Sequence, residues 1–448
     1  MTAPAFQSGR FRRAAIVLLL WLLPVAAWSL WDYVEARRLS AAVKATASGE
    51  PTSPGTAPGS YPFPAPQNSA GVYYEAAALL MDRSTLSEIE TALQYGRGDR
   101  AKVIARLRAW LDDNREAEGL IEDGTKAEFK GFRLYDNLRW DRLWLVSSLA
   151  RARLTERLES RDADGAAAAL VRQVRITRGM ASATPDSLPF AMERALANLE
   201  PVLDLKPSGK PLERLQQAIR GNDRDSLLYE DAVKSRALLI ESLWNPGSDW
   251  YGRPSVAFGT NPLEPIAYFL ARPWFAHRVN TEIRRMNVVV ARSRAAWPER
   301  LKADPVPMPQ ISASRWRFLD SPADTVAYLQ RQRVAAIARM LAQVRSADCV
   351  IAIERYRQAH QGALPAALDS LMPQFLERTP VDPFSGASLK FTVQGNRYAV
   401  YSIGADFKDD GGTALSAAPR PETGNQARRD LAPDIGFTVT AEPAAQAR

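Results

Sequence analysis

The sequence predicts a mainly α-helical protein that ends in a small α+β region. Three observations support this: apolar residues recur at helical spacing over most of residues 70–304, a long helix is expected from Pro322 to His360, and two short alternating runs follow it. A chain of 448 residues with 46% apolar and 24% charged side chains has the composition of globular domains. Its length allows two or three of them.

The N-terminal stretch predicts a transmembrane helix. Residues 1–13 are short and basic, with Arg10, Arg12 and Arg13, and the following run AAIVLLLWLLPVAAWSLW carries no charge. About 20 apolar residues are needed to cross the hydrocarbon core of a bilayer. We therefore expect a cytoplasmic tail over 1–13 and a single-pass anchor over 14–34. Basic residues ahead of the span place the bulk of a bacterial inner-membrane protein in the periplasm.

A cleaved signal peptide is the alternative interpretation of this stretch. Val25, Ala26 and Ala27 offer small residues near the end of the run, as a cleavage site would require. The apolar stretch continues past them through Trp28 and Trp31, which makes it longer than the usual apolar core of a signal peptide. This favours an uncleaved anchor.

Residues 35–69 predict a linker, and residues 70–304 predict a helical domain. Six prolines lie among Gly, Ser and Thr in 46–69, a composition that cannot build a core. In the helical domain, apolar stripes such as Leu145 and Leu149 are separated by polar breaks, as in antiparallel helical hairpins. The pattern loosely resembles tetratricopeptide repeats, although no roughly 34-residue period can be aligned.

Residues 244–275 interrupt the helical pattern with aromatic, Gly and Pro residues. A long ordered loop of this kind is often functional. It could cover a ligand or a hydrolase site, with Asp249, Arg253 and Glu264 among its charged groups. The alternative is that Trp250 and the other aromatic side chains close the end of the helical bundle.

The C-terminal region carries the most specific pattern. After a linker over 305–321, we expect the long helix, a short helix opening at Leu364-Pro365, and a Pro-rich turn over 380–386. Alternating runs on either side of Gln394-Gly395-Asn396 predict a β-hairpin. Residues 434–439 predict a last strand, and 441–448 a disordered tail.

This order resembles the globular head of the major pseudopilins of type II secretion systems. The matching segments are Leu364-Pro365, the turn Pro380-Val-Asp-Pro383, Tyr398 through Asp406, Asp409-Asp410-Gly-Gly412 and Asp434-Ile-Gly436. They span about a quarter of the chain, and we expect a pseudopilin-like domain over 322–440. The N-terminus departs from the family, because Arg12-Arg13 follow Phe11 and no Glu lies in the apolar run. Processing as a pilin is therefore not expected.

The resemblance implies a calcium ion that fastens an acidic loop to the sheet. The ligands it implies are Asp406, Asp409, Asp410 and Asp434. Carboxylate oxygens suit calcium, which takes about 6–8 oxygen ligands. The alternative is a solvated Asp-Gly turn that binds no ion.

The sequence gives little support for nucleic-acid binding, for cysteine or histidine catalysis, or for the common nucleotide-binding and hydrolase motifs. The net charge of +8 is spread over helical stretches that also carry acids, which does not favour nucleic-acid binding. Cys349 is the only cysteine and lies in an apolar run, and His277 and His360 are the only histidines. No nucleophile elbow, P-loop or dinucleotide-binding glycine pattern occurs.

The sequence therefore supports three hypotheses of function. The first is a non-enzymatic, membrane-anchored periplasmic scaffold or assembly protein that contacts other envelope proteins, linked to type II secretion or pilus-like systems. The second is a helical scaffolding or ligand-binding protein unrelated to secretion. The third is a hydrolase with its site under residues 244–275. No small-molecule ligand is identified by the sequence.

Overall fold

A computed structural model describes residues 7–47, 66–129, 139–183, 188–244, 264–301, 322–412, 415 and 434–441. The described chain is mainly helical and carries one three-stranded antiparallel sheet, as the sequence predicts. It divides into two compact units. Unit 1 comprises Met1–Pro58, Tyr229–Arg294 and Ala303–Arg331, and unit 2 comprises Gly59–Leu228, Ala295–Lys302 and Gln332–Arg448.

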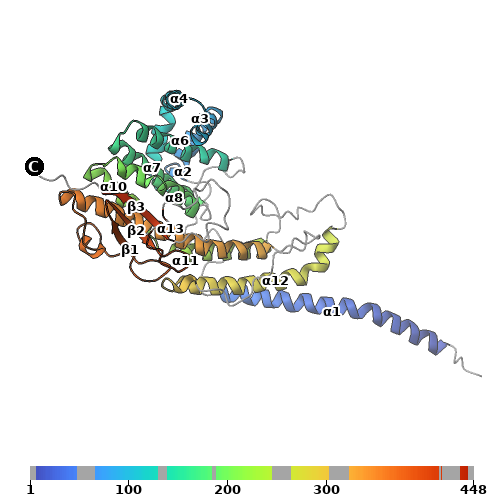
Figure 1. The fold of residues 1–448 in the computed structure, drawn as a ribbon. Coiled ribbons are helices and arrows are strands. Elements are labelled where there is room, and N and C mark those ends of the chain that lie inside the picture. Colours follow the sequence, from blue (N-terminus) through green and yellow to red (C-terminus); the bar gives the residue numbers. More distant parts are fainter. Residues whose placement is uncertain are drawn as a thin grey trace, which may run out of the picture. The chain divides into compact units, whose positions relative to one another are not determined.

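The described part of unit 1 contains α1 (Gln7–Ala47), all but the first two residues of α11 (Leu227–Trp244), α12 (Glu264–Ser293) and the first ten residues of α13 (Pro322–Ala359). Figure 1 shows α1 running alongside α12. Ile240, Val279, Ile283 and Met286 form a small buried core, against which Leu39 and Val43 of α1 pack. The helical pattern of α1 therefore continues well beyond its apolar run, into a packed amphipathic segment.

The predicted membrane anchor is corrected by the structure. Within the part of the chain that the structure describes, no helix combines the length and apolar character needed to cross a bilayer. The apolar run of α1 contains Pro24 and passes without a break into Asp32, Glu35 and Arg38. Glu35 is buried beside α12 and pairs with Arg38 at 2.9 Å. The single-pass anchor over 14–34 and the inner-membrane location that follows from it are therefore not supported.

Several other predicted segments lie partly or wholly outside the described residues. Helix α1 reaches Ala47, so the first part of the predicted linker over 35–69 is helical, and residues 48–65 lie outside the described part. The same holds for most of the 244–275 segment, for the linker over 305–321 and for the tail after 441.

The first half of unit 2 consists of helical hairpins. They are α2 (Ala70–Leu80), α3 (Arg83–Tyr95), α4 (Arg100–Asp113), α5 (Arg115–Lys126), α6 (Arg139–Glu159) and α7 (Ala163–Ala183). Side-chain caps begin two of them, because Asp82 accepts the Ser84 N–H at 3.0 Å and Asp99 accepts the Ala101 N–H at 2.9 Å. Tyr74 is fully buried in the core of these hairpins.

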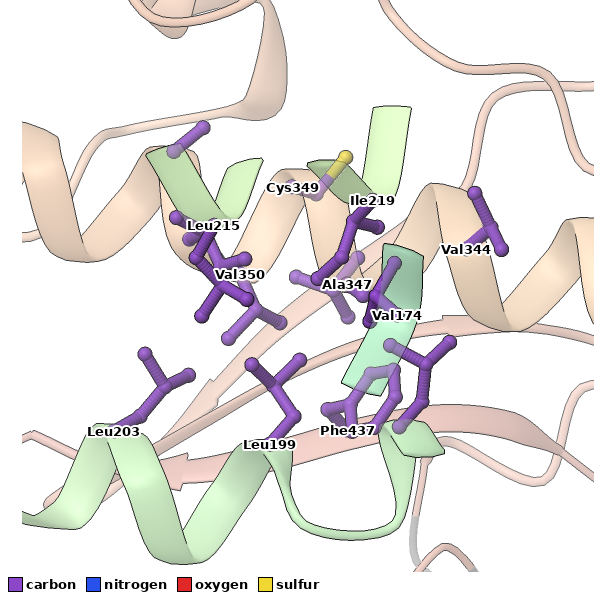
Figure 2. Packing of buried hydrophobic residues seen from close by; sticks show 14 of the residues in the cluster. Val174, Leu199, Leu203, Leu215, Ile219, Val344, Ala347, Cys349, Val350 and Phe437 are labelled. Carbon is purple, nitrogen blue, oxygen red and sulfur yellow. The ribbon is translucent and has the colours of Figure 1, made fainter. Parts of the chain in front are cut away.

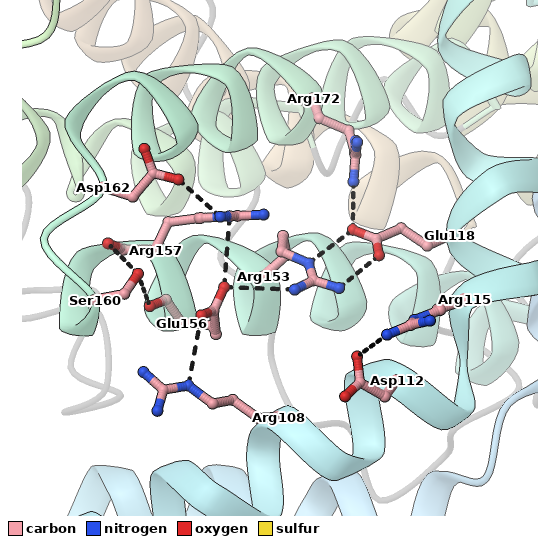
Figure 3. A network of polar contacts seen from close by, with 10 residues as sticks. All are labelled: Arg108, Asp112, Arg115, Glu118, Arg153, Glu156, Arg157, Ser160, Asp162 and Arg172. Atoms are coloured by element: carbon pink, nitrogen blue, oxygen red, sulfur yellow. Dashed lines mark hydrogen bonds and ion pairs between the residues drawn. The ribbon is translucent and has the colours of Figure 1, made fainter.

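Ion pairs tie α5, α6 and α7 together on their polar side (Figure 3). Glu118 lies between Arg153 at 2.7 Å and Arg172 at 2.6 Å, and Glu156 joins Arg153 to Arg108. Burial alone would raise the pKa of Glu118, but the two arginines lower it below its ordinary value. These ion pairs thus join α5, α6 and α7 to one another.

The second half of unit 2 joins shorter helices to the sheet. It contains α8 (Leu188–Leu196), α9 (Leu199–Asp204), α10 (Gly209–Arg220), η3 (Glu299–Leu301), α13 (Pro322–Ala359), of which residues 322–331 belong to unit 1, and η5 (Leu368–Leu371). The strands are β1 (Lys390–Gln394), β2 (Arg397–Ser402) and β3 (Ile435–Thr440), in the spatial order β1-β2-β3. The predicted long helix, hairpin and last strand are therefore all present.

One hydrophobic core unites the hairpin helices with the sheet. Val174 of α7, Leu199 of α9, Ile219 of α10, Val350 of α13 and Phe437 of β3 are all buried in it (Figure 2). Residues 70–228 and 332–441, which the sequence assigned to separate domains, thus share one compact unit. The sheet region is therefore part of this compact unit.

A buried polar cluster also joins α10 to α13, and we name it the α10–α13 cluster. It consists of Gln216, Arg220, Asp348 and Arg355. The carboxylate of Asp348 accepts hydrogen bonds from Gln216 Nε2 at 2.6 Å and from Arg220 at 3.1 Å, and Arg355 donates to Gln216 Oε1 at 2.6 Å. Burial raises the pKa of Asp348, and the adjacent Arg220 guanidinium opposes that shift.

Candidate functional site

The residues after β2 form an acidic loop (residues 403–412) that folds back over the sheet. Side chains alternate along β2, so Tyr398 faces α13, where its hydroxyl donates to Glu354 at 2.6 Å, while Tyr401 faces the opposite side. A Cβ placed on Gly412 would lie 2.9 Å from the Tyr401 ring. The loop backbone therefore lies directly against Tyr401 and covers it.

Glycine at 436 lets the neighbouring strand β3 approach the backbone of β2 closely at Tyr401. Gly436 pairs with Tyr401 across β2 and β3, and a Cβ there would lie 2.0 Å from the Val400 carbonyl oxygen and 2.8 Å from Tyr401 Cβ. No larger residue fits this approach unless the strands separate. Close packing of β2 against β3 thus explains why a glycine occupies position 436 in the Asp434-Ile-Gly436 motif.

Asp434 fastens the acidic loop to the start of β3. Its Oδ2 accepts the N–H of Gly412 at 2.8 Å, and its Oδ1 accepts the N–H of Asp410 at a longer 3.4 Å. Burial raises the pKa of the Asp434 carboxyl above its ordinary value, while the Gly412 N–H opposes the shift. Asp434 therefore links loop and sheet by direct hydrogen bonds.

Asp409 fastens the loop at a second point. Its Oδ1 accepts the Tyr401 hydroxyl at 2.9 Å and the Gly411 N–H at 3.0 Å, and its Oδ2 pairs with Lys390 at 3.3 Å. The Gly411 N–H is the main cause that lowers the pKa of Asp409. Burial, followed by the hydrogen bond to Asp409, raises the pKa of Tyr401.

The four predicted calcium ligands are only partly brought together. Asp409, Asp434 and the backbone of Asp410 share this network, whereas Asp406 accepts the N–H of Lys408 at 3.1 Å in a local turn. Among the described residues, no three His, Cys, Asp or Glu side chains gather in a way that could hold a metal ion. In this structure the Lys390 ammonium and the Tyr401 hydroxyl are the side-chain partners of Asp409. Calcium binding stays a prediction of the resemblance.

Asp382, in the Pro-rich turn, holds the beginning of the acidic loop. It is almost completely buried, and its carboxylate accepts the Ser402 hydroxyl at 2.6 Å, the Ser385 hydroxyl at 2.8 Å, the Phe384 N–H at 2.9 Å and the Ile403 N–H at 3.3 Å. The sequence pattern contained this residue without indicating its role. Four donors explain how a buried carboxylate is tolerated at the end of β2.

Phe407, at the tip of the loop, was not indicated by the sequence. Its side chain is 56% exposed, its backbone is left-handed with a φ of 59°, and its ring contacts Phe384 edge-on at 6.2 Å between centroids. A bulky residue rarely adopts this backbone conformation, and such strain concentrates at functional sites. Only the backbone geometry of the folded chain reveals it.

Comparison of the chain with protein-family models, with curated proteins and with solved structures finds no match. The likeness to pseudopilins therefore depends on the motifs quoted above.

Proposed function

We propose that this protein is a non-enzymatic scaffold or assembly protein that acts through protein–protein contacts, with a C-terminal module of the pseudopilin type. The observation that carries the proposal is the acidic loop, which is fastened against Tyr401 by Asp409 and Asp434 while it leaves Phe407 exposed. The loop is thus held in one shape and presents an aromatic side chain outward.

The exposed aromatic ring is the proposed contact residue. Aromatic side chains are enriched among the residues that contribute most to protein interfaces, because they bury a large area and have few rotatable bonds. Phe407 keeps its position despite an unfavourable backbone conformation, because Asp382 fixes the loop on one side and Asp409 and Asp434 fix it on the other. This supports the proposal that Phe407 serves to present its ring to a partner and does not serve to stabilise the loop.

The resemblance supplies the class of partner. The order of long helix, Pro-rich turn, hairpin, acidic loop and last strand agrees with the order that the pseudopilin motifs imply. We therefore infer that the partner belongs to a type II secretion or pilus-like assembly. The helical hairpins would then act as the scaffold on which this loop is presented.

Site-specific photo-crosslinking in cells tests the partner class. A photoreactive residue at 407 is expected to crosslink to components of a secretion or pilus-like assembly. The matched control carries it at Tyr95, another exposed aromatic of unit 2, which is 63% exposed at the end of α3. Equal crosslinking at both positions, or partners from unrelated systems only, would contradict the proposal.

Replacing Phe407 by glycine separates binding from stability. Phe407→Gly relieves the left-handed backbone but loses the ring contact with Phe384, and these opposing effects should leave the free energy of unfolding within about 1 kcal/mol of wild type. Affinity capture, by this variant, of the partner that crosslinking identified should fall at least tenfold. Unchanged capture by this variant, with the fold intact by circular dichroism, would argue against the ring as the contact.

A further inference from the structure

The outer edge of β1 is an unpaired strand edge among the described residues. The N–H of Ala441 donates to the Asn396 carbonyl at 2.7 Å, which fixes the hydrogen-bonding alternation along β2. The backbone N–H and C=O groups of the even-numbered residues of β2 therefore point toward β3. Those of the odd-numbered residues bond to β1, through the partner residues Lys390, Thr392 and Gln394. The backbone N–H and C=O groups of Phe391 and Val393 consequently point away from the sheet.

The two edges of the sheet differ in whether their outward backbone groups have hydrogen-bond partners among the described residues. At β3, the outward N–H of Thr438 donates to Glu200 Oε1 of α9 at 2.8 Å, so a side chain closes that edge. At β1, neither Phe391 nor Val393 has a backbone hydrogen bond to any described segment outside the hairpin. An edge strand with free backbone groups is a template for pairing with another strand.

The side chains at the β1 edge favour an apolar strand as the partner. Phe391 lies opposite Val400, and Val393 lies opposite Tyr398, on the sheet face that packs against α13. The apolar face therefore ends at Val393, whose side chain is 48% exposed. The lysine at the start of the strand does not protect the edge, since Lys390 pairs with Asp409.

We propose that β1 pairs antiparallel with β1 of a second copy of this chain, about a two-fold axis at Thr392. In this register Phe391 lies opposite Val393 of the other copy, and their outward backbone groups meet as hydrogen-bonded pairs. Lys390 lies opposite Gln394, so no like charges face each other. The strand is thus self-complementary in hydrogen bonds, apolar contacts and charge.

The second copy is favoured over an unrelated peptide by this self-complementarity, since a two-fold contact requires the same patch to match itself. A pair of five-residue strands buries less area than the about 1,200–2,000 Å² of a stable interface, so the dimer should be weak and reversible. The β1 edge and the acidic loop are different surfaces, so this inference holds whether or not Phe407 binds a partner.

Disulfide trapping in the full chain tests the register. In Thr392→Cys, the two introduced cysteines face each other as a non-hydrogen-bonded pair with Cα atoms about 4.5 Å apart, which a disulfide can bridge. The native Cys349 is buried, so wild type supplies the background. We expect mild oxidation to convert Thr392→Cys to a covalent dimer.

Lys390→Cys is the matched control. In the proposed register its two copies lie about 14 Å apart, four residues along antiparallel strands, which is too far for a disulfide. Equal crosslinking of both variants, or none of Thr392→Cys, would overturn the proposed register.

A second measurement does not depend on disulfide chemistry. Sedimentation of the full chain over a concentration series should show reversible dimerisation, and Val393→Lys should raise the dimer Kd at least tenfold by placing a charge at the apolar edge. Val393 is half exposed in the single chain, so this variant should fold normally. Wild type that stays monomeric at high micromolar concentration, or a dimer unaffected by Val393→Lys, would contradict the inference.

Discussion

The two polar clusters of unit 2 use similar side chains in different surroundings. In the α10–α13 cluster Gln216 and Asp348 are buried, and the partly exposed Arg220 covers the Asp348 carboxylate. The cluster around Asp409 lies at the surface, where Lys390 and Asp409 remain about half exposed. An enclosed carboxylate joins helices, whereas the loop carboxylates fasten a segment whose outer side stays open to a partner.

The largest expected effect is the removal of the buried carboxylate. Asp348→Ala leaves Arg220 and Gln216 without the carboxylate they share, although both still reach the Phe375 carbonyl. We expect it to lower the free energy of unfolding by about 3 kcal/mol in urea denaturation. Arg220 keeps Glu377 at 2.9 Å, which moderates the loss. The control is Asp112→Ala, an exposed ion pair with Arg115, which should cost less than about 0.5 kcal/mol. Similar losses for both variants would remove the contrast between buried and exposed clusters.

A smaller effect is expected where a carboxylate fastens the loop. Asp434→Ala removes the acceptor of the Gly412 and Asp410 N–H groups, and we expect a loss of about 1–3 kcal/mol. Amide hydrogen exchange localises the effect, because Gly412 should exchange faster while the α10–α13 cluster keeps its protection. Uniform acceleration across unit 2 would show that the loop is not an independently fastened segment.

The smallest effect concerns Asp409, whose pKa in the folded protein lies below its ordinary value of 3.8. A carboxyl group with a lowered pKa in the folded state stabilises the protein at pH values above its ordinary, unfolded-state pKa. This stabilisation is lost as the pH falls through the folded-state pKa. Asp409→Asn should therefore destabilise at pH 7 by less than about 1 kcal/mol, because the side chain is half exposed. Thermal melts should converge with wild type in strong acid. A difference that grows on acidification would reverse the assigned sign.

Asp434 should behave in the opposite sense. Burial raises its folded pKa, so its ionisation disfavours folding, and stability falls as the pH rises through that higher value. Asp409 of the acidic loop and Asp434 before β3 therefore respond oppositely to pH, although the sequence presents them as equivalent members of one acidic group.

Local patterns in the sequence predicted the elements of this fold but not their association. Alternation around Gln394-Gly395-Asn396 predicted β1 and β2, and helical spacing predicted α13. The shared core was not visible, because periodicity shows which face of α10 is apolar and not that Ile219 would pack in the core that also holds Phe437. The mixed acidic and basic residues of the helical stretches likewise did not indicate the network centred on Glu118.

The candidate site was predicted in part. The acidic residues and the loop position were found from the motif, whereas Asp406 proved separate from Asp409 and Asp434. Phe407 could not be found, since its left-handed backbone depends on contacts made only after folding. The apolar run near the N-terminus indicated a membrane span by composition alone, and the structure did not support it.

The hydrogen bond between Thr438 and Glu200 links residues 238 positions apart. During synthesis, α7 to α10 emerge long before β3, so the apolar side chains that pack with Phe437 lack this partner until β3 has left the ribosome. Contacts of such sequence separation slow folding and expose incomplete chains to aggregation. A nascent chain arrested before β3 would therefore leave part of this core without the strand that covers it.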